Sequence, residues 1–171
     1  ISVSGNIEGI DKTKVKEIVF VFSGQGTKSL DIDWGLYEFT PSIPPAADQN
    51  LVITQLPLVN PGIFSSAATV GNVMTSKTFM TTSYTGNTAN SFGGTVYTYA
   101  TPINLTTLFP SGIVFSLDNN GTVLPEVILE IKDENNNVWK AKLTGLSSSL
   151  QKYLISVSGN IEGIDKTKVK E

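Results

Sequence analysis

The sequence EVILEIK at residues 126–132 decides the fold, because its aliphatic side chains recur at every second position. A period of two is typical of a strand with one buried face and one solvated face. The Asp- and Asn-rich residues 133–137 are strong turn formers. Residues 139–143, WKAKL, then alternate in the same way. We therefore predict an antiparallel hairpin over residues 126–143.

Other parts of the chain carry the same signal. Residues 18–22, IVFVF, are apolar throughout, as in a strand that is covered on both faces. We predict that a hairpin joins this strand through the Gly24–Gly26 turn to the alternating residues 30–37. Further strands are predicted at 51–56, 96–99, 113–117 and 153–157, and one short helical turn at 11–16. Residues 60–90, rich in Thr, Ser, Asn and Gly, match no pattern. The whole indicates an all-β sandwich of two antiparallel sheets.

The chain also repeats itself. Residues 1–17, ISVSGNIEGIDKTKVKE, are identical to residues 155–171, so the offset is 155 − 1 = 154 residues, the size of a domain. A natural tandem array and an engineered duplication both produce such a pattern. The proline-rich residues 41–50 read as a natural spacer and favour the array. We interpret residues 1–40 as the C-terminal part of one module, 41–50 as a linker and 51–171 as the body of the next.

The order of these segments resembles a known family. A strand ending at Lys132-Asp133, a turn, a Lys-rich strand, residues 151–153, then residues 10–21 and finally LDIDW at 30–34 looks like the second half of the galactose-binding-domain-like jelly rolls. That superfamily includes many carbohydrate-binding modules. The resemblance covers about the last half of the module. It implies a jelly roll cut out of phase, with the C-terminal strands of the module at the N-terminus of the chain.

Composition excludes many kinds of chemistry. The chain has no Cys, no His and no Arg, so all 12 basic residues are Lys. The common zinc sites and the Ser-His-Asp and Cys-His nucleophile arrangements are therefore absent. A net charge of -3 and the lack of Arg disfavour nucleic acid as a partner. No apolar run is long enough to span a bilayer. Cys-free chains rich in Ser, Thr and Asn are common among bacterial surface repeats, so we expect an extracellular or cell-surface location.

The resemblance directs attention to two carboxylates. Asp31 and Asp33 lie two residues apart on one strand face, near the edge where related jelly rolls often hold a structural calcium ion. Calcium prefers hard oxygen ligands but takes six to eight of them. The alternative is a pair of solvated carboxylates that discourages edge pairing between chains. Calcium is the one cofactor that the sequence proposes.

A glycan would need an exposed ring with polar neighbours. The candidate residues are Tyr84, Tyr97, Tyr99 and Trp139, with Asn136 as polar company. Aromatic residues at alternating positions in a sandwich usually fill its core, and this interpretation is favoured for Trp34 and Trp139. Tyr84, among small polar residues, is the ring that packing explains least. Strand alternation makes Glu130 a surface residue rather than a catalytic acid, and we predict that the chain is not an enzyme.

The duplicated segment carries the most specific inference. Residues 41–154 can accept only one of two identical segments in the same place. The chain either closes on itself, using its own residues 1–39, or takes the strands that follow the repeat from a neighbour, which gives an open fibre. The segments concerned contain Ile1, Val3, Val15, Ile18, Phe20, Phe22, Ile155, Val157 and Val169.

These observations predict a non-catalytic structural repeat that builds a fibre, stalk or sheath from identical neighbouring modules. The alternative function is a carbohydrate-binding module of a surface adhesin or of a secreted glycoside hydrolase, with a polysaccharide as its partner.

Overall fold

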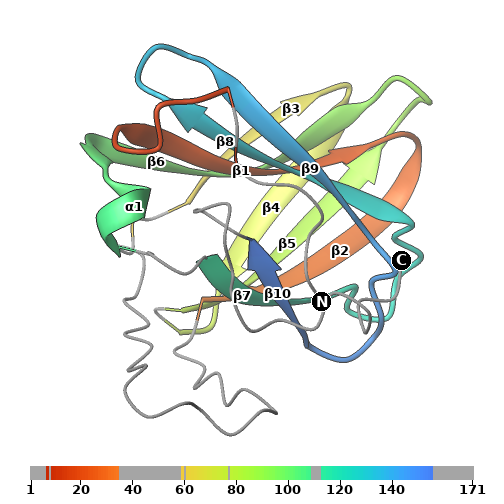
Figure 1. The fold of residues 1–171 in the computed structure, drawn as a ribbon. Coiled ribbons are helices and arrows are strands. Elements are labelled where there is room, and N and C mark those ends of the chain that lie inside the picture. The colour runs from red at the N-terminus through yellow and green to blue at the C-terminus, as the bar shows by residue number, and fades with distance from the viewer. Residues whose placement is uncertain are drawn as a thin grey trace, which may run out of the picture.

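The protein is a sandwich of two five-stranded antiparallel sheets (Figure 1). The computed structural model describes residues 7, 9–34, 59, 61–76, 78–108 and 113–155. The first sheet has the strand order β3-β6-β1-β8-β9 and the second β10-β7-β2-β5-β4. The elements are β1 (Val15–Ser23), β2 (Gly26–Asp33), β3 (Gly62–Ser66), β4 (Ala68–Met74), β5 (Phe79–Gly86), β6 (Phe92–Ile103), α1 (Leu105–Leu108), β7 (Ile113–Asp118), β8 (Glu126–Asp133), β9 (Val138–Thr144) and β10 (Gln151–Ile155).

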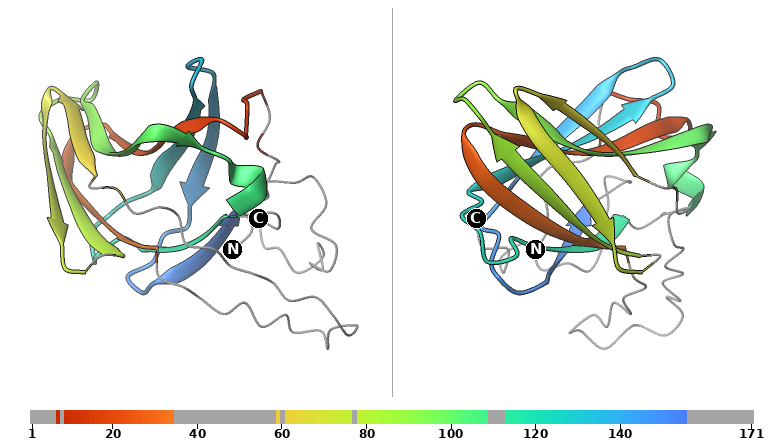
Figure 2. Two further views of the ribbon diagram at one scale, coloured as in Figure 1. Left: turned by 90° about the vertical axis from the view of Figure 1, so that its left-hand side faces the viewer. Right: turned by 180° about the vertical axis from the view of Figure 1, so that it is seen from behind.

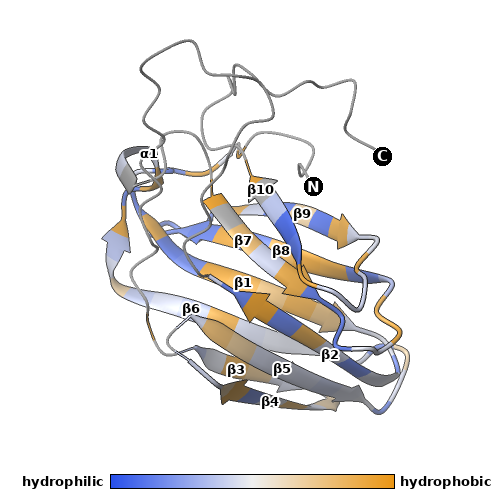
Figure 3. Cartoon of the chain, turned by 90° about the horizontal axis from the view of Figure 1, so that it is seen from below, coloured by the Kyte–Doolittle hydropathy of each residue, from blue (hydrophilic) through white to orange (hydrophobic). Residues whose placement is uncertain are grey.

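The all-β two-sheet sandwich that the sequence predicts is confirmed, and its strand arrangement is compatible with a jelly roll. The hairpin of β8 and β9 is present, with Ile131 opposite Trp139 and Val127 opposite Leu143. Its inward side chains alternate with charged ones, which appear as orange and blue bands along the strands (Figure 3). In the described part of the chain, no helix is long and apolar enough to cross a membrane.

The strands β1 and β2 do not form the hairpin that the sequence predicted. They belong to different sheets, so the connection between them bends from one layer of the sandwich to the other, at the right-hand edge of Figure 1. The bend uses Gly24 and Gly26, whose φ angles are +84° and +99°, a conformation that side chains with a Cβ rarely adopt. Gly24 N donates a hydrogen bond to Ser91 O over 2.8 Å. We call residues 15–33 the β1–β2 arch.

The arch lies at the centre of both layers. The strand β1 pairs with β6 on one side and β8 on the other, and β2 pairs with β5 and β7. The views in Figure 2 show β1 and β2 inside their sheets rather than at the edges. Ile18, Phe20 and Phe22 point into the core, while Val19, on the opposite face, is also buried. The inner face of the strand is buried as predicted, whereas on its outer face Val19 is buried and Val21 is half-buried.

The core between the sheets is rich in aromatic rings. Trp34 packs edge-on to Tyr97 with ring centroids 5.5 Å apart, and its ring lies 5.2 Å from that of Phe115. Phe115 also stacks on Tyr153 at 5.9 Å. Such contacts add to the free energy gained by burying the rings. Sequence-distant segments, from β1 to β10, therefore share one hydrophobic core.

Two regions differ from the sequence analysis. Residues 60–90 contain the whole of β3, β4 and β5, none of which was predicted. Residues 11–14 form a hydrogen-bonded turn instead of a helical one, with Lys14 N bonded to Asp11 O, and β1 begins directly afterwards at Val15. The predicted strand at 51–56 and the linker at 41–50 lie outside the described residues.

Candidate functional site

Each copy of the repeated segment contributes a described residue to the core of the sandwich. Ile155, the first residue of the second copy, ends β10 opposite Ile113 and is only 1% exposed. Ile7, the seventh residue of the first copy, is 0% exposed and belongs to the same core. Position 1 of the repeat is thus buried in the core from the second copy, and position 7 from the first copy.

Of the residues expected in assembly, Val15, Ile18, Phe20, Phe22 and Ile155 are all buried in this core. The other four, Ile1, Val3, Val157 and Val169, lie outside the described residues.

The first copy is held in place by the turn between β8 and β9. We call residues 133–137 the acceptor turn. Asp11 N donates a hydrogen bond to Asp133 Oδ2 over 2.8 Å, and Glu134 N donates to Lys14 O over 3.0 Å. Lys14 Nζ lies 2.5 Å from Glu134 Oε1. On the other side of the segment, Leu105 N at the start of α1 donates to Lys12 O over 2.8 Å.

Asp133 organises the acceptor turn. Asp133 is 1% exposed. Its carboxylate also accepts hydrogen bonds from Asn135 N, Asn137 N and Asn137 Nδ2. The bond from Asp11 N, followed by that from the Asn137 side chain, holds the pKa of Asp133 below its usual value. This environment favours the ionised form, whereas a general acid in glycoside hydrolysis needs a raised pKa.

The four predicted glycan-binding rings lie in the core. Tyr84 is 0% exposed, stacks on Phe22 with centroids 5.5 Å apart and donates a hydrogen bond to Gly24 O over 2.7 Å. Tyr97 and Tyr99 point between the sheets, and burial raises the pKa of Tyr97 to about 12. Trp139 is buried as well, in keeping with its position on the inward face of β9.

These rings therefore offer no exposed platform, and Tyr84, the ring that packing was expected to explain least, is fully packed. Asn136 is exposed in the acceptor turn, where its φ angle is 63°. None of the four buried rings offers an exposed face beside it.

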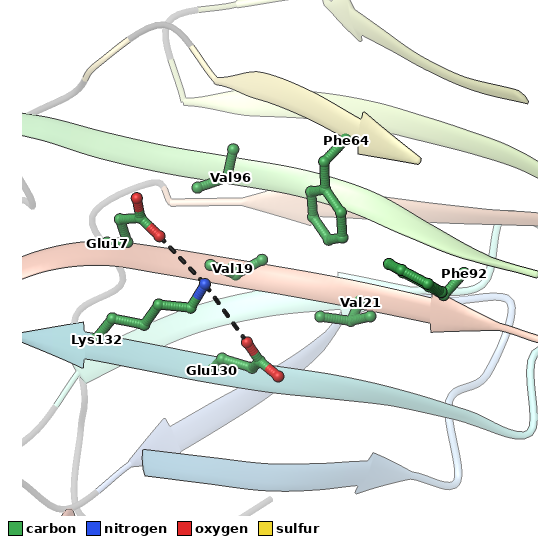
Figure 4. Close-up of a pocket in the computed structure, with 8 residues that line it drawn as sticks. All are labelled: Glu17, Val19, Val21, Phe64, Phe92, Val96, Glu130 and Lys132. Carbon is green, nitrogen blue, oxygen red and sulfur yellow. Dashed lines mark ion pairs between the residues drawn. The ribbon is translucent and has the colours of Figure 1, made fainter. Parts of the chain in front are cut away.

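A different aromatic surface exists on the outer face of the first sheet. A groove of about 470 Å³ is lined by Glu17, Val19, Val21, Phe64, Phe92, Val96, Glu130 and Lys132 (Figure 4). Phe92 is 46% exposed. The ammonium of Lys132 lies 3.3 Å from Glu17 and 3.8 Å from Glu130. Lys140, beside the groove, lies 2.7 Å from Glu130, so two lysines balance the two glutamates.

Sequence reasoning missed this groove because its residues come from β1, β3, β6 and β8, which are separated along the chain. The one available signal was the unbroken apolar run at 18–22. It places Val19 and Val21 on the face opposite Ile18, Phe20 and Phe22, so that the outer face is apolar too.

The predicted calcium ligands lie on the outer face of the second sheet. Thr81 Oγ1 donates a hydrogen bond to Asp31 Oδ1 over 2.6 Å, and Asp118 is the cross-strand neighbour of Asp31. Burial, and then the charge of Asp118, raise the pKa of Asp31. Asp33 occupies the same strand face two residues on. Among the described residues, no group of three or more acidic side chains is gathered so that it could hold a metal ion. Calcium at Asp31 and Asp33 stays a prediction.

Replacing Asp31 by asparagine is expected to raise the melting temperature at neutral pH in the absence of calcium. The pKa of Asp31 is raised in the folded state, so its ionisation disfavours folding above the ordinary value of 3.8. The amide oxygen of the new side chain could still accept the bond from Thr81. Because folding raises the pKa, the advantage of D31N should disappear at pH values below the ordinary one, where Asp31 is protonated in both states.

Differential scanning calorimetry across pH measures this effect, with Glu126→Gln, at a half-buried carboxylate of β8, as a control. Added calcium should stabilise the wild type and not D31N. A lower melting temperature for calcium-free D31N than for the wild type at neutral pH would contradict the account.

No protein-family model, no curated protein and no solved structure matches this chain.

Proposed function

We propose that this chain is a non-catalytic structural repeat module of the extracellular space or cell surface. Identical neighbouring units build a fibre, stalk or sheath, and strands are completed between them. The observation that carries the proposal is that Ile155 of the second copy and Ile7 of the first copy are buried in the same core. On this proposal the module is a jelly roll of the galactose-binding-domain-like kind, which the order of its segments resembles, and it occurs as a tandem repeat.

Burial of residues from both copies in one core is what a continuous array would produce. In an array, β10 of a module would run through one copy of the repeated segment directly into β1 and β2. The seventeen positions of the segment are the same in both copies, so one uninterrupted copy supplies both the buried first position and the buried seventh. The sandwich formed here from two partial copies therefore has the side chains that one whole copy would provide. The natural order of the module on this proposal is β3 to β10, followed by β1 and β2.

The position of the arch makes exchange between units effective. Without β1, the first sheet separates into β3-β6 and β8-β9, and without β2 the second separates into β10-β7 and β5-β4. A body lacking its arch therefore has two split sheets and an open core. Donation of the arch from one unit to the next is a head-to-tail interaction, which propagates into an open fibre.

The experiment that tests this proposal mixes two damaged chains, one with a lesion in the arch and one with a lesion in the body. If the arch passes between chains, the mixture regains folded sandwiches that neither chain forms alone. The lesions and outcomes are given in the Discussion.

One observation favours a second candidate, the binding of a neutral polysaccharide. The groove on the first sheet combines the rings of Phe64 and Phe92 with the polar groups of Glu17, Glu130 and Lys132 (Figure 4). A sugar can stack its apolar face on a ring while its hydroxyls bond carboxylates and ammonium groups. Because Lys132 pairs with both glutamates and Lys140 also pairs with Glu130, the groove and its rim have little net charge to attract a charged ligand.

For this candidate, Phe92→Ala is expected to reduce retention on insoluble neutral polysaccharides in a pull-down or affinity electrophoresis assay. The loss should be on the order of tenfold, because one stacking contact in a small site supplies about 1 kcal/mol or more. Val123→Ala is the matched control, since Val123 is also an exposed apolar side chain but lies outside the groove. Equal retention of the two variants would exclude the groove as a glycan site.

A further inference from the structure

We propose that the acceptor turn, residues 133–137, is a docking site for the second copy of the repeated segment, and that residues 163–168 can replace residues 9–14 there. This inference rests on the proposed function, because it describes how the second copy of the segment replaces the first at one site. Both stretches read GIDKTK.

The contacts at the acceptor turn suit an exchange between identical segments. Two of them involve main-chain groups of the segment, Asp11 N to Asp133 Oδ2 and Glu134 N to Lys14 O, and a third main-chain bond joins Leu105 N of α1 to Lys12 O. These bonds define the position and direction of the segment. The second copy carries the same residues at the same spacing, so it can form every one of them.

The segment also carries the features that shape it. Asp11 Oδ1 accepts hydrogen bonds from Thr13 N over 2.9 Å and from Thr13 Oγ1 over 2.6 Å, which closes a local turn. Gly9 has a φ of +73°, where a residue with a Cβ would be strained. Asp165, Thr167 and Gly163 are the equivalent residues of the second copy. A segment that forms its own turn loses less conformational entropy on docking.

The acceptor side is formed largely by contacts that do not involve the segment. Three of the four hydrogen bonds to the Asp133 carboxylate come from Asn135 and Asn137 within the turn, and only one comes from Asp11. The bond from Asp11 N is the largest cause of the lowered pKa of Asp133, and the donors of Asn137 and Asn135 lower it further. The turn therefore keeps most of its geometry when the first copy leaves.

Exchange at this site has a consequence for assembly. The first copy leads directly into the arch, since Val15 follows Lys14 in β1. While residues 9–14 are docked, they hold the arch of the same chain in its own body. When residues 163–168 take their place, that anchor is lost, and the arch is free to pass to a neighbouring unit.

Disulfide trapping tests the inference on the full chain, which has no cysteine of its own. Glu134 N is bonded to Lys14 O, so the two residues lie at a separation suited to a disulfide. Glu134→Cys with Lys14→Cys should cross-link readily under mild oxidation and serves as the positive control. Glu134→Cys with Lys168→Cys reports docking of the second copy. Glu134→Cys with Lys170→Cys, two residues further along the same segment, is the matched control for random collision.

We expect the 134–168 pair to cross-link on the order of tenfold faster than the 134–170 pair, because docking raises the effective concentration of one thiol at the other. Electrophoresis separates links within one chain from links between chains, and either type shows the second copy at the acceptor turn. Equal rates for residues 168 and 170, or no link at residue 168, would overturn the inference. If no specific cross-link forms but the mixed chains refold, docking of the second copy is rejected and arch donation stands. If the cross-link forms but the mixed chains do not refold, arch donation is rejected and docking of the second copy stands.

Discussion

Replacing Phe20 by alanine is expected to lower the free energy of unfolding by about 3–5 kcal/mol, the usual cost of removing a buried ring from a core. Phe20 is fully buried at the centre of β1. Its ring centroid lies 5.8 Å from that of Phe115 in the opposite sheet and 6.0 Å from that of Trp34. Removing it opens a cavity where the two sheets meet, in a domain whose total stability is typically only about 5–15 kcal/mol.

Urea denaturation followed by tryptophan fluorescence measures this effect, since Trp34 reports directly on the Phe20 contact. The matched control is Val21→Ala, the next residue of the same strand, whose side chain lines the outer groove instead of the core. It should cost about 1 kcal/mol, because less apolar surface is lost there. Equal midpoints for the two variants would show that β1 does not present Phe20 to the core.

Replacing Gly94 by alanine is expected to be at least as damaging, at about 4 kcal/mol or more, a range reserved for a few specific lesions. A Cβ built at Gly94 would lie 1.9 Å from Phe20 O and 3.2 Å from Val21 Cα. These are backbone atoms of the neighbouring strand, so no side-chain rotation relieves the overlap. The pairing of β6 with β1 has to open locally, which disturbs the centre of the first sheet.

Gly62→Ala provides the comparison, because Gly62 lies in the same sheet and its added Cβ would meet only Val96, with Cγ1 at 3.4 Å and O at 3.8 Å. Its stability should stay within about 1 kcal/mol of the wild type, since alanine also restricts the unfolded chain. Thermal unfolding by circular dichroism distinguishes the two. A Gly94→Ala protein as stable as Gly62→Ala would mean that β1 and β6 are not in the register described here.

The sequence predicts the strands whose inward residues are aliphatic. In β8 and β9 the alternation of hydrophobic and charged side chains identifies both the strands and their buried faces. The strand β5 is not predicted, because its inward residues include the polar Thr82. Thr82 is fully buried and donates a hydrogen bond to Asn72 Oδ1 over 2.9 Å. Polar side chains satisfied between the sheets do not show in a hydropathy pattern.

The candidate sites are harder to predict for a related reason. The Asn-rich turn after β8 is visible in the sequence, but its contact with Asp11 joins residues 122 positions apart. The same holds for the groove, where Phe64 and Phe92 come together only through the pairing of β3 with β6. Burial of Tyr84 could have been anticipated from its alternation with Met80 and Thr82 on one strand face. Because both the inward and the outward positions of this strand include short polar residues, the period of two does not appear as an alternation of apolar and polar side chains.

The most direct test of arch donation mixes the Phe20→Ala and Gly94→Ala chains. One lesion lies in the arch and the other in the body, so the arch of the Gly94→Ala chain and the body of the Phe20→Ala chain together make an undamaged sandwich. The chains are unfolded, mixed at equal concentration and refolded at a urea concentration that only the wild type tolerates.

Tryptophan fluorescence and light scattering are then read on the mixture. We predict recovery of up to about half of the wild-type folded signal, in particles larger than one chain, because every donated arch links two chains. Recovery no greater than the sum of the two separate variants, with a mass of 18.3 kDa at every concentration, would contradict assembly by strands shared between neighbouring units.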